Sequence, residues 1–101
     1  DLQLLAKDTR TLYGAEAKYL VALQWYNAGN YASAEKEILN FIDQSTPYAY
    51  WLARSFILLS DVYVAMDKKL DARQYLLSLQ QNYQADDDIA SMINERLEKL
   101  K

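Results

Sequence analysis

Hydrophobic residues recur along this chain at intervals of three and four, the spacing of one face of an α-helix. No stretch shows the sustained alternation of apolar and polar residues that marks a half-buried β-strand. The pattern predicts helices over about 13–28, 31–43, 48–66 and 70–82, a last helix opened by the acidic run 86–88 and continuing nearly to Lys101, and the end of another helix at 1–9. The expected fold class is therefore all-α.

The breaks between these segments carry residues suited to helix ends. Gly29-Asn30 ends the helix over 13–28, since both residue types tolerate the left-handed conformation common at helix C-termini. Pro47 lacks a backbone donor and fits the first turn of the helix that follows it. The polar triplet Asp67-Lys68-Lys69 forms the next turn. Short turns of this kind favour antiparallel helical hairpins.

Two of the expected helices differ sharply in how much of their surface is apolar. The helix over 48–66 is apolar on nearly all sides, with Arg54 and Asp61 as its only charges, so it should lie between neighbours on both flanks. The final helix has one apolar stripe, formed by Ile89, Ile93, Leu97 and Leu100. A helix apolar on one face only suits the open end of a stack of hairpins, where it seals the core and faces water.

The chain also repeats itself. The segment 23–34 returns 38 residues later as 61–72, each copy being an aromatic-rich helix end, a polar turn and a second helix entered through a small Ala. A period of this size predicts a solenoid of helical hairpins. Because solenoids usually present surfaces to partners, the repeat favours a binding scaffold over an enzyme.

Composition narrows the classes of function. The chain has 101 residues, 51% of them hydrophobic, with two Gly and one Pro, which suits one small helical domain. The net charge is −3 and no block of Lys or Arg occurs, so nucleic acid and anionic membranes are not expected as partners. No apolar run approaches the roughly 20 residues needed to insert across a bilayer.

Cys and His are both absent, which excludes disulfides, thiol nucleophiles, zinc sites and His-based acid–base catalysis. The acidic run 86–88 has the wrong spacing for a calcium loop, because Ser91 stands where Gly is needed and Leu97 where Glu is needed. We interpret it as a helix N-cap. No metal, cofactor or catalytic residue is expected, and the chain is predicted not to be an enzyme.

The repeated segments resemble the tetratricopeptide repeat (TPR) family. In the first repeat the resemblance rests on Val21-Ala22, Trp25, Gly29-Asn30-Tyr31, Ala34, Ile38, Phe41 and Pro47, and in the second on Leu59-Ser60, Tyr63, Asp67, Ala72, Leu76 and Leu79. It implies an α-solenoid with repeats over 13–46 and 47–83, a preceding repeat's tail at 1–10, and a capping helix at 86–101. It also implies close helix crossings at Ala22 with Ala34 and at Ser60 with Ala72.

This chain departs from the family pattern in two ways. Its 38-residue period is a few residues longer than the family's, and the excess lies at the start of the helix over 48–66, which carries Tyr48, Tyr50 and Trp51. The second turn has Asp67 and Lys69 where the family prefers Gly and Tyr. The segments 5–10 and 50–56 are also similar to the C-terminal part of long bacterial TPR proteins of the cell envelope, which implies a periplasmic location; the residues alone leave the compartment open.

In the TPR family the first helix of each hairpin lines a concave groove that binds a peptide or a partner helix. The positions that the resemblance places there are Glu16, Tyr19, Leu23, Tyr26, Asn27, Tyr50, Arg54, Ile57 and Asp61, with Val64 beyond them. Tyr19 and Leu23 stand where some members clamp a peptide carboxylate, so that mode of binding is not expected. The predicted function is non-catalytic protein–protein interaction at the C-terminal end of a TPR superhelix.

The sequence is also compatible with two other functions. The domain could be a purely structural end-cap of the solenoid, or it could complete the site of an enzyme located elsewhere in a longer chain. The first residues look like helix interior, so we expect a fragment whose N-terminal end, residues 1 to 20, can self-associate.

Overall fold

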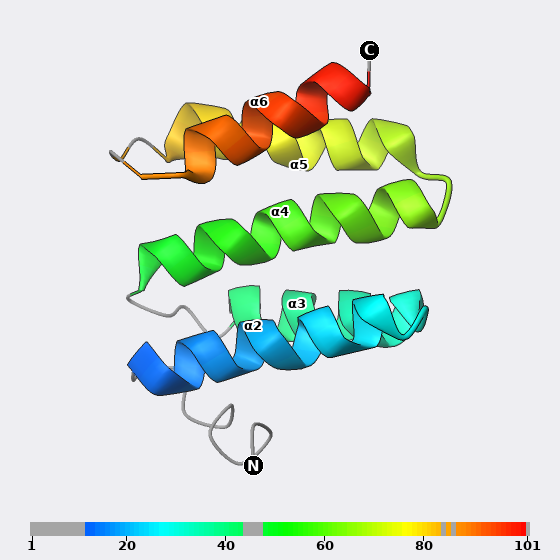
Figure 1. Cartoon of the computed structure of the whole chain (residues 1–101), viewed down its shortest axis with the longest axis vertical. Helices are drawn as coiled ribbons and strands as arrows, with labels where there is room; N and C mark the ends of the chain where they lie inside the picture. Colours follow the sequence, from blue (N-terminus) through cyan, green and yellow to red (C-terminus); the bar gives the residue numbers. More distant parts are fainter. Residues whose placement is uncertain (1–11, 44–47, 84, 86, 101) are drawn as a thin grey trace.

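The computed structural model describes residues 12–43, 48–83, 85 and 87–100, with side chains described from Ala15 onward. Its regular elements are five helices: α2 (Leu12–Asn27), α3 (Tyr31–Asp43), α4 (Ala49–Ala65), α5 (Lys69–Asn82) and α6 (Ile89–Lys99) (Figure 1). The all-α class is confirmed, and these helices begin and end close to the expected positions. The expected helical tail at 1–10 and the break at Pro47 lie outside the described residues.

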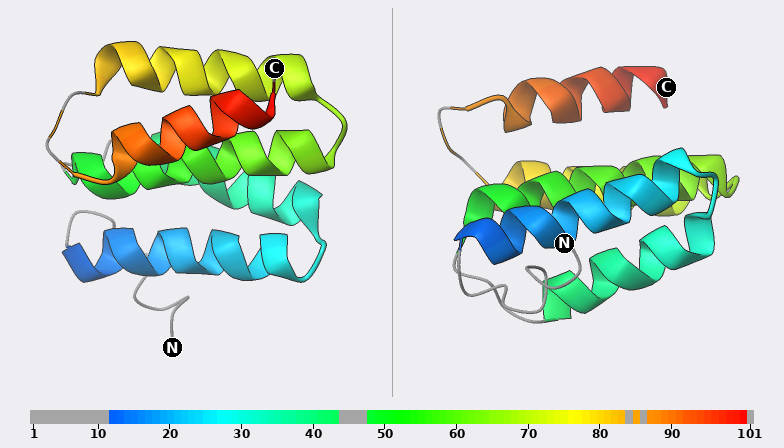
Figure 2. Two further views of the ribbon diagram at one scale, coloured as in Figure 1. Left: turned by 45° about the horizontal axis from the view of Figure 1, so that its top comes forward. Right: turned by 60° about the horizontal axis from the view of Figure 1, so that its bottom comes forward.

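The helices form a stack of antiparallel hairpins. The three helices α2, α4 and α6 run in one direction, while α3 and α5 run in the other (Figures 1 and 2). Each helix packs against the next along the chain, and α4 also packs against both α2 and α6. The result measures 39 × 31 × 19 Å, with the longest axis along the stack. Helices α2, α4 and α6 therefore lie in this order along the molecule, with α4 in contact with the other two.

The two turns that lie 38 residues apart in the sequence have the same backbone geometry. Gly29 (φ 80°) and Asp67 (φ 62°) occupy the same place after α2 and α4, both in the left-handed region. In each turn, the backbone N–H of the following residue donates a hydrogen bond to a carbonyl in the last turn of the helix. Asn30 donates to Trp25 at 2.9 Å, and Lys68 donates to Tyr63 at 2.7 Å. Both turns thus close with the long backbone bond of a Schellman-type cap.

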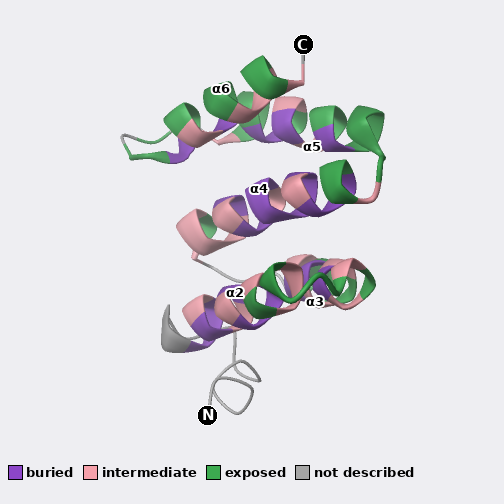
Figure 3. Ribbon diagram, turned by 45° about the vertical axis from the view of Figure 1, so that its right-hand side comes forward, coloured by how far each residue is buried: buried purple, intermediate pink, exposed green. Residues whose placement is uncertain are grey.

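Helix α4 is the central element of the core, as its composition predicts. It contributes eight buried residues, and burial runs along most of its length (Figure 3). The four small residues expected at the helix crossings are all buried: Ala22, Ala34, Ser60 and Ala72. The Ser60 hydroxyl donates to the Ile57 carbonyl at 2.6 Å, which satisfies this polar group inside the core. Small side chains at these points allow the helices to approach closely.

Helix α6 covers the far end of the core through its apolar stripe. Ile89 and Ile93 are almost fully buried and form one cluster with Ile57, Leu76 and Leu79. Its other face is polar and exposed. At the opposite end, Trp25 is half-buried and packs against two clusters, so it fills space between helices without being enclosed. Within the described residues, no helix combines the length and apolar character required to cross a bilayer.

Candidate functional site

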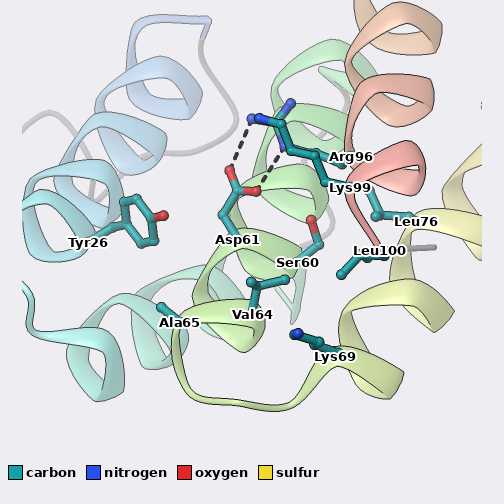
Figure 4. A pocket seen from close by; sticks show the side chains of 10 residues that line it. All are labelled: Tyr26, Ser60, Asp61, Val64, Ala65, Lys69, Leu76, Arg96, Lys99 and Leu100. Carbon is teal, nitrogen blue, oxygen red and sulfur yellow. Dashed lines mark hydrogen bonds and ion pairs between the residues drawn. The ribbon is translucent and has the colours of Figure 1, made fainter.

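A pocket of about 460 Å³ opens between α4 and α6, with Tyr26 of α2 on one side (Figure 4). This volume falls within the range of sites that hold small molecules or side chains. The lining residues come from α2, α4, α5 and α6 and from Leu100, which follows α6: Tyr26, Ser60, Asp61, Val64, Ala65, Lys69, Leu76, Arg96, Lys99 and Leu100. At the C-terminal end of α4, Val64 and Ala65 are exposed and contribute to the pocket wall.

An ion pair joins α4 to α6 at the edge of this pocket. Arg96 donates from Nε and Nη2 to the two carboxylate oxygens of Asp61 at 2.9 and 3.0 Å (Figure 4). Both side chains are about a quarter exposed, so water screens the pair only in part. Arg96 Nη1 also donates to the Met92 carbonyl at 3.3 Å, which fixes the guanidinium. A bidentate contact of this kind sets the distance and angle between two helices.

Tyr26 stands at one side of the pocket (Figure 4). Burial, and next the negative charge of Asp61, raise the pKa of the Tyr26 phenol above its ordinary value. At neutral pH a tyrosine phenol is protonated, so this hydroxyl can donate a hydrogen bond at the rim.

A second cluster occupies the start of α4 and joins three helices; we call it the Arg54 cluster (Tyr19, Tyr50, Trp51, Arg54 and Asp88). Arg54 donates to the hydroxyls of Tyr50 at 2.9 Å and Tyr19 at 3.2 Å, and its guanidinium lies 5.1 Å from the centre of the Tyr19 ring. Tyr50 in turn donates to Asp88 at 3.0 Å. The rings of Tyr19 and Trp51 are 5.6 Å apart.

The Arg54 cluster satisfies most of its own polar groups. Burial alone would lower the pKa of Arg54, but its hydrogen bonds with Tyr50 and Tyr19 outweigh this effect, and the net shift is upward. The Arg54 Nε atom is buried and has no hydrogen-bond partner among the residues that the structure describes. The aromatic residues at the start of α4 thus join α2, α4 and α6. On the face that these three helices share, the end at the start of α4 is therefore closed by contacts within the protein.

The structure divides the predicted groove residues into three groups. Tyr26 and Asp61 line the pocket, together with Val64. Tyr19, Tyr50 and Arg54 belong to the Arg54 cluster. The remaining positions on α2 do not join either group: Glu16 is half-buried, Leu23 packs against the core, and Asn27 is exposed at the helix end.

Two of these residues are not on the surface. Ile57 is 1% exposed and Tyr19 is 6% exposed, so the expectation that both present apolar surface to a ligand is wrong. Ile57 turns into the cluster that α6 covers, because the approach of α6 makes that side of α4 interior. Tyr19 is covered by Arg54 and Trp51.

Most residues of the pocket wall, including Lys69, Arg96 and Lys99, were not predicted from the sequence. We expected the polar residues of α6 to face water as the outside of a cap. One signal was available: Asp61 is one of two charges on an otherwise apolar helix, and a half-buried carboxylate needs a counter-ion from a neighbouring element. Arg96 supplies it.

The acidic turn before α6 fits the predicted helix cap only in part, because the N-cap residue Asp88 makes no side-chain hydrogen bond to the helix and Asp87 bonds its first N–H instead. The Asp87 carboxylate accepts a hydrogen bond from the Ile89 N–H at 2.9 Å and another from the Tyr83 hydroxyl. Asp88 accepts from Tyr50 instead, and Asp86 lies outside the described residues. In the part of the chain that the structure describes, no group of three or more acidic side chains is placed to hold a metal ion.

Comparison with known proteins gives no relative: no family model, curated protein or solved structure matches this chain.

Proposed function

We propose that this chain is a non-catalytic protein–protein interaction module, the C-terminal part of a TPR-like solenoid whose groove binds a peptide or partner helix. The single observation that carries this proposal is the pocket of about 460 Å³ on the face formed by α2, α4 and α6. A protein or peptide is the proposed partner, and nucleic acid is not.

The arrangement of the helices supports the solenoid part of the proposal. Two hairpins with the same turn geometry follow each other at a 38-residue offset, with left-handed residues at Gly29 and Asp67. The first helix of each hairpin packs on the first helix of the next, as α2 does on α4 and α4 on α6. Stacks of this kind bury a continuous core and present one helix of each unit on a shared face.

The chemistry of the pocket supports binding over catalysis. The Ser60 hydroxyl donates a hydrogen bond to a backbone carbonyl, and the Asp61 carboxylate is held in a bidentate ion pair. Neither group is poised as a nucleophile or a base. Apolar surface from Val64, Ala65 and Leu100 beside a few polar groups is the usual composition of a recognition pocket.

One observation favours a second role. Helix α6 seals the core with Ile89 and Ile93 and turns a polar face outward, which is what a structural end-cap does. The two roles are compatible, since α6 also forms one wall of the pocket.

The experiment fills the pocket without changing charge. Ala65 is exposed and lines the pocket, so Ala65→Trp should place an indole in it. Ala32→Trp, at an exposed position on α3 outside the pocket, is the matched control. Random 12-residue peptides displayed on phage are selected on the parent chain, and the enriched peptides are synthesised and titrated against all three proteins.

We expect Ala65→Trp to weaken the selected peptides at least about tenfold, a loss of roughly 1.4 kcal/mol, while Ala32→Trp leaves affinity within about twofold. Equal affinity for the parent and Ala65→Trp would place binding elsewhere and overturn the proposal. Tyr19, Arg54 and Ile57 are unsuitable as test positions because they pack in the core or between helices.

A further inference from the structure

We infer that the occupant of the pocket is an acidic peptide segment, in which an aliphatic side chain enters between α4 and α6 and neighbouring Asp or Glu carboxylates pair with Lys69 and Lys99. This inference rests on the proposed function and names the class of partner for that site.

The charges around the pocket give the first argument. Four charged side chains line it, three cationic and one anionic: Lys69, Arg96, Lys99 and Asp61. Asp61 and Arg96 neutralise each other through their bidentate contact. The two lysines remain, in a protein whose net charge is −3. A local excess of positive charge on an acidic protein favours an acidic partner through complementarity.

The partners of the two lysines give the second argument. Lys99 contacts Glu95 at 3.5 Å one turn earlier on α6, with side chains 73% and 62% exposed, a geometry that contributes little. Lys69 forms no ion pair with any other described residue, and it lines the pocket together with Val64 and Leu100 (Figure 4). Both ammonium groups can therefore pair with a ligand at little cost in existing contacts.

The position of Lys69 gives the third argument. It is the first residue of α5, where the helix dipole is positive and a cation is unfavourable. Lys68, just before it, lies 5.8 Å from the Tyr63 ring and so has a structural contact. Lys69 has no comparable contact and lines the pocket instead. Its placement is explained by a ligand carboxylate better than by the stability of α5.

The apolar part of the pocket completes the description of the ligand. Val64, Ala65, Leu76 and Leu100 supply aliphatic surface, while the cationic groups come from the start of α5 and the end of α6. An engineered cavity of about 150 Å³ already holds a benzene-sized molecule. A pocket of about 460 Å³ therefore has room for an aliphatic side chain and part of its backbone.

The test uses three displayed 12-residue libraries that share Leu, Ile and Val at half of their positions. The other half is Asp and Glu in the acidic library, Asn and Gln in the neutral one, and Lys and Arg in the basic one. Each library is selected on the full 101-residue chain, on Ala65→Trp, and on the double variant Lys69→Glu/Lys99→Glu. Lys36→Glu/Arg73→Glu, at exposed positions on α3 and α5, reproduces the charge change outside the pocket.

We expect the acidic library to enrich on the parent and on Lys36→Glu/Arg73→Glu, but not on Ala65→Trp. Its peptides should bind Lys69→Glu/Lys99→Glu at least about tenfold more weakly, and weaken when NaCl rises from about 50 to 300 mM. Selection of neutral or basic peptides that Ala65→Trp blocks would overturn the acidic partner while leaving the groove function intact. Acidic peptides insensitive to Lys69→Glu/Lys99→Glu would also overturn it. Peptides insensitive to Ala65→Trp would overturn both proposals.

Discussion

At the scale of single residues, the two turns show how one backbone shape is made from different side chains. Gly29 and Asp67 hold the same left-handed conformation, but only Gly holds it without steric cost. Asp is among the few other residues that tolerate it, since its short polar side chain can bond locally. The second turn therefore differs from the first in strain, while its backbone shape is the same.

Substitutions at the two left-handed positions should change the free energy of unfolding in opposite directions. Gly29→Ala should lower the free energy of unfolding by about 1 kcal/mol, because a Cβ is costly at positive φ. Nothing lies within 4 Å of that Cβ, so no clash adds to the cost. Asp67→Gly should raise the free energy of unfolding by about 0.5 kcal/mol through relief of strain. Urea denaturation measures both; shifts of the same sign would contradict this account of the turns.

Tyr83 gives a prediction about pH. Burial, and then its hydrogen bond to Asp87, raise the pKa of the Tyr83 phenol to about 12. The unfolded chain loses this proton near pH 10, before the folded chain does. The contribution of Tyr83 to stability is therefore complete below about pH 10 and is lost as pH rises toward about 12. Urea midpoints measured from pH 8 to 11 should fall less steeply for Tyr83→Phe than for the parent, and parallel curves would count against the shift.

At the scale of helices, close approach depends on small residues and orientation depends on ion pairs. Ala34 is fully buried where α3 meets the core, and Lys18 of α2 pairs with Glu37 of α3 at 2.7 Å. The first hairpin is therefore packed tightly over its length. Helix α6 is held by a narrower set of contacts, chiefly its two isoleucines and Arg96.

The crossing of α3 with the core can be tested by overpacking. Ala34→Leu should lower the free energy of unfolding by about 1–3 kcal/mol, because the larger side chain forces the helices apart. Ala32→Leu, an exposed position on the same helix, should be nearly neutral. Thermal or urea unfolding compares the two; equal stability of both variants would mean that Ala34 is not at a tight crossing.

The attachment of α6 can be tested at Arg96. Arg96→Met keeps the apolar stem but removes the bonds to Asp61 and to the Met92 carbonyl, and should lower the free energy of unfolding by about 1–2 kcal/mol. Hydrogen exchange should become faster in α6 and stay unchanged in the hairpin of α2 and α3. Lys99→Met, whose contact with Glu95 is exposed, should have little effect on either region. Uniformly faster exchange over the whole chain would instead indicate that α6 does not open by itself.

At the scale of the whole molecule, local pattern predicted the helices but not the details of the face that α2, α4 and α6 share. Apolar spacing and turn residues are local signals, and they located α3 at Tyr31–Asp43 as expected. Which side of α4 is exposed depends on how close α6 comes, and this is set by packing between segments distant in sequence. For this reason Ile57 was expected at the surface and is buried, while Arg96 and Lys99 were expected on the outside of a cap and line a pocket.

The common direction of α2, α4 and α6 has a consequence for any peptide bound along them. All three run in the same direction (Figure 1). The Arg54 cluster joins the starts of α4 and α6 to the middle of α2, and the pocket lies beside the C-terminal parts of all three. The two ends of the face therefore differ in chemistry: one is closed by Arg54, Tyr50 and Asp88, and the other is open. A surface with unlike ends distinguishes the N-terminus of an extended ligand from its C-terminus. A peptide selected on this chain and a second peptide with the same residues in reverse order have identical composition and charge, yet titration should find the reversed one about tenfold weaker or worse. Equal affinity would mean that the face recognises composition alone.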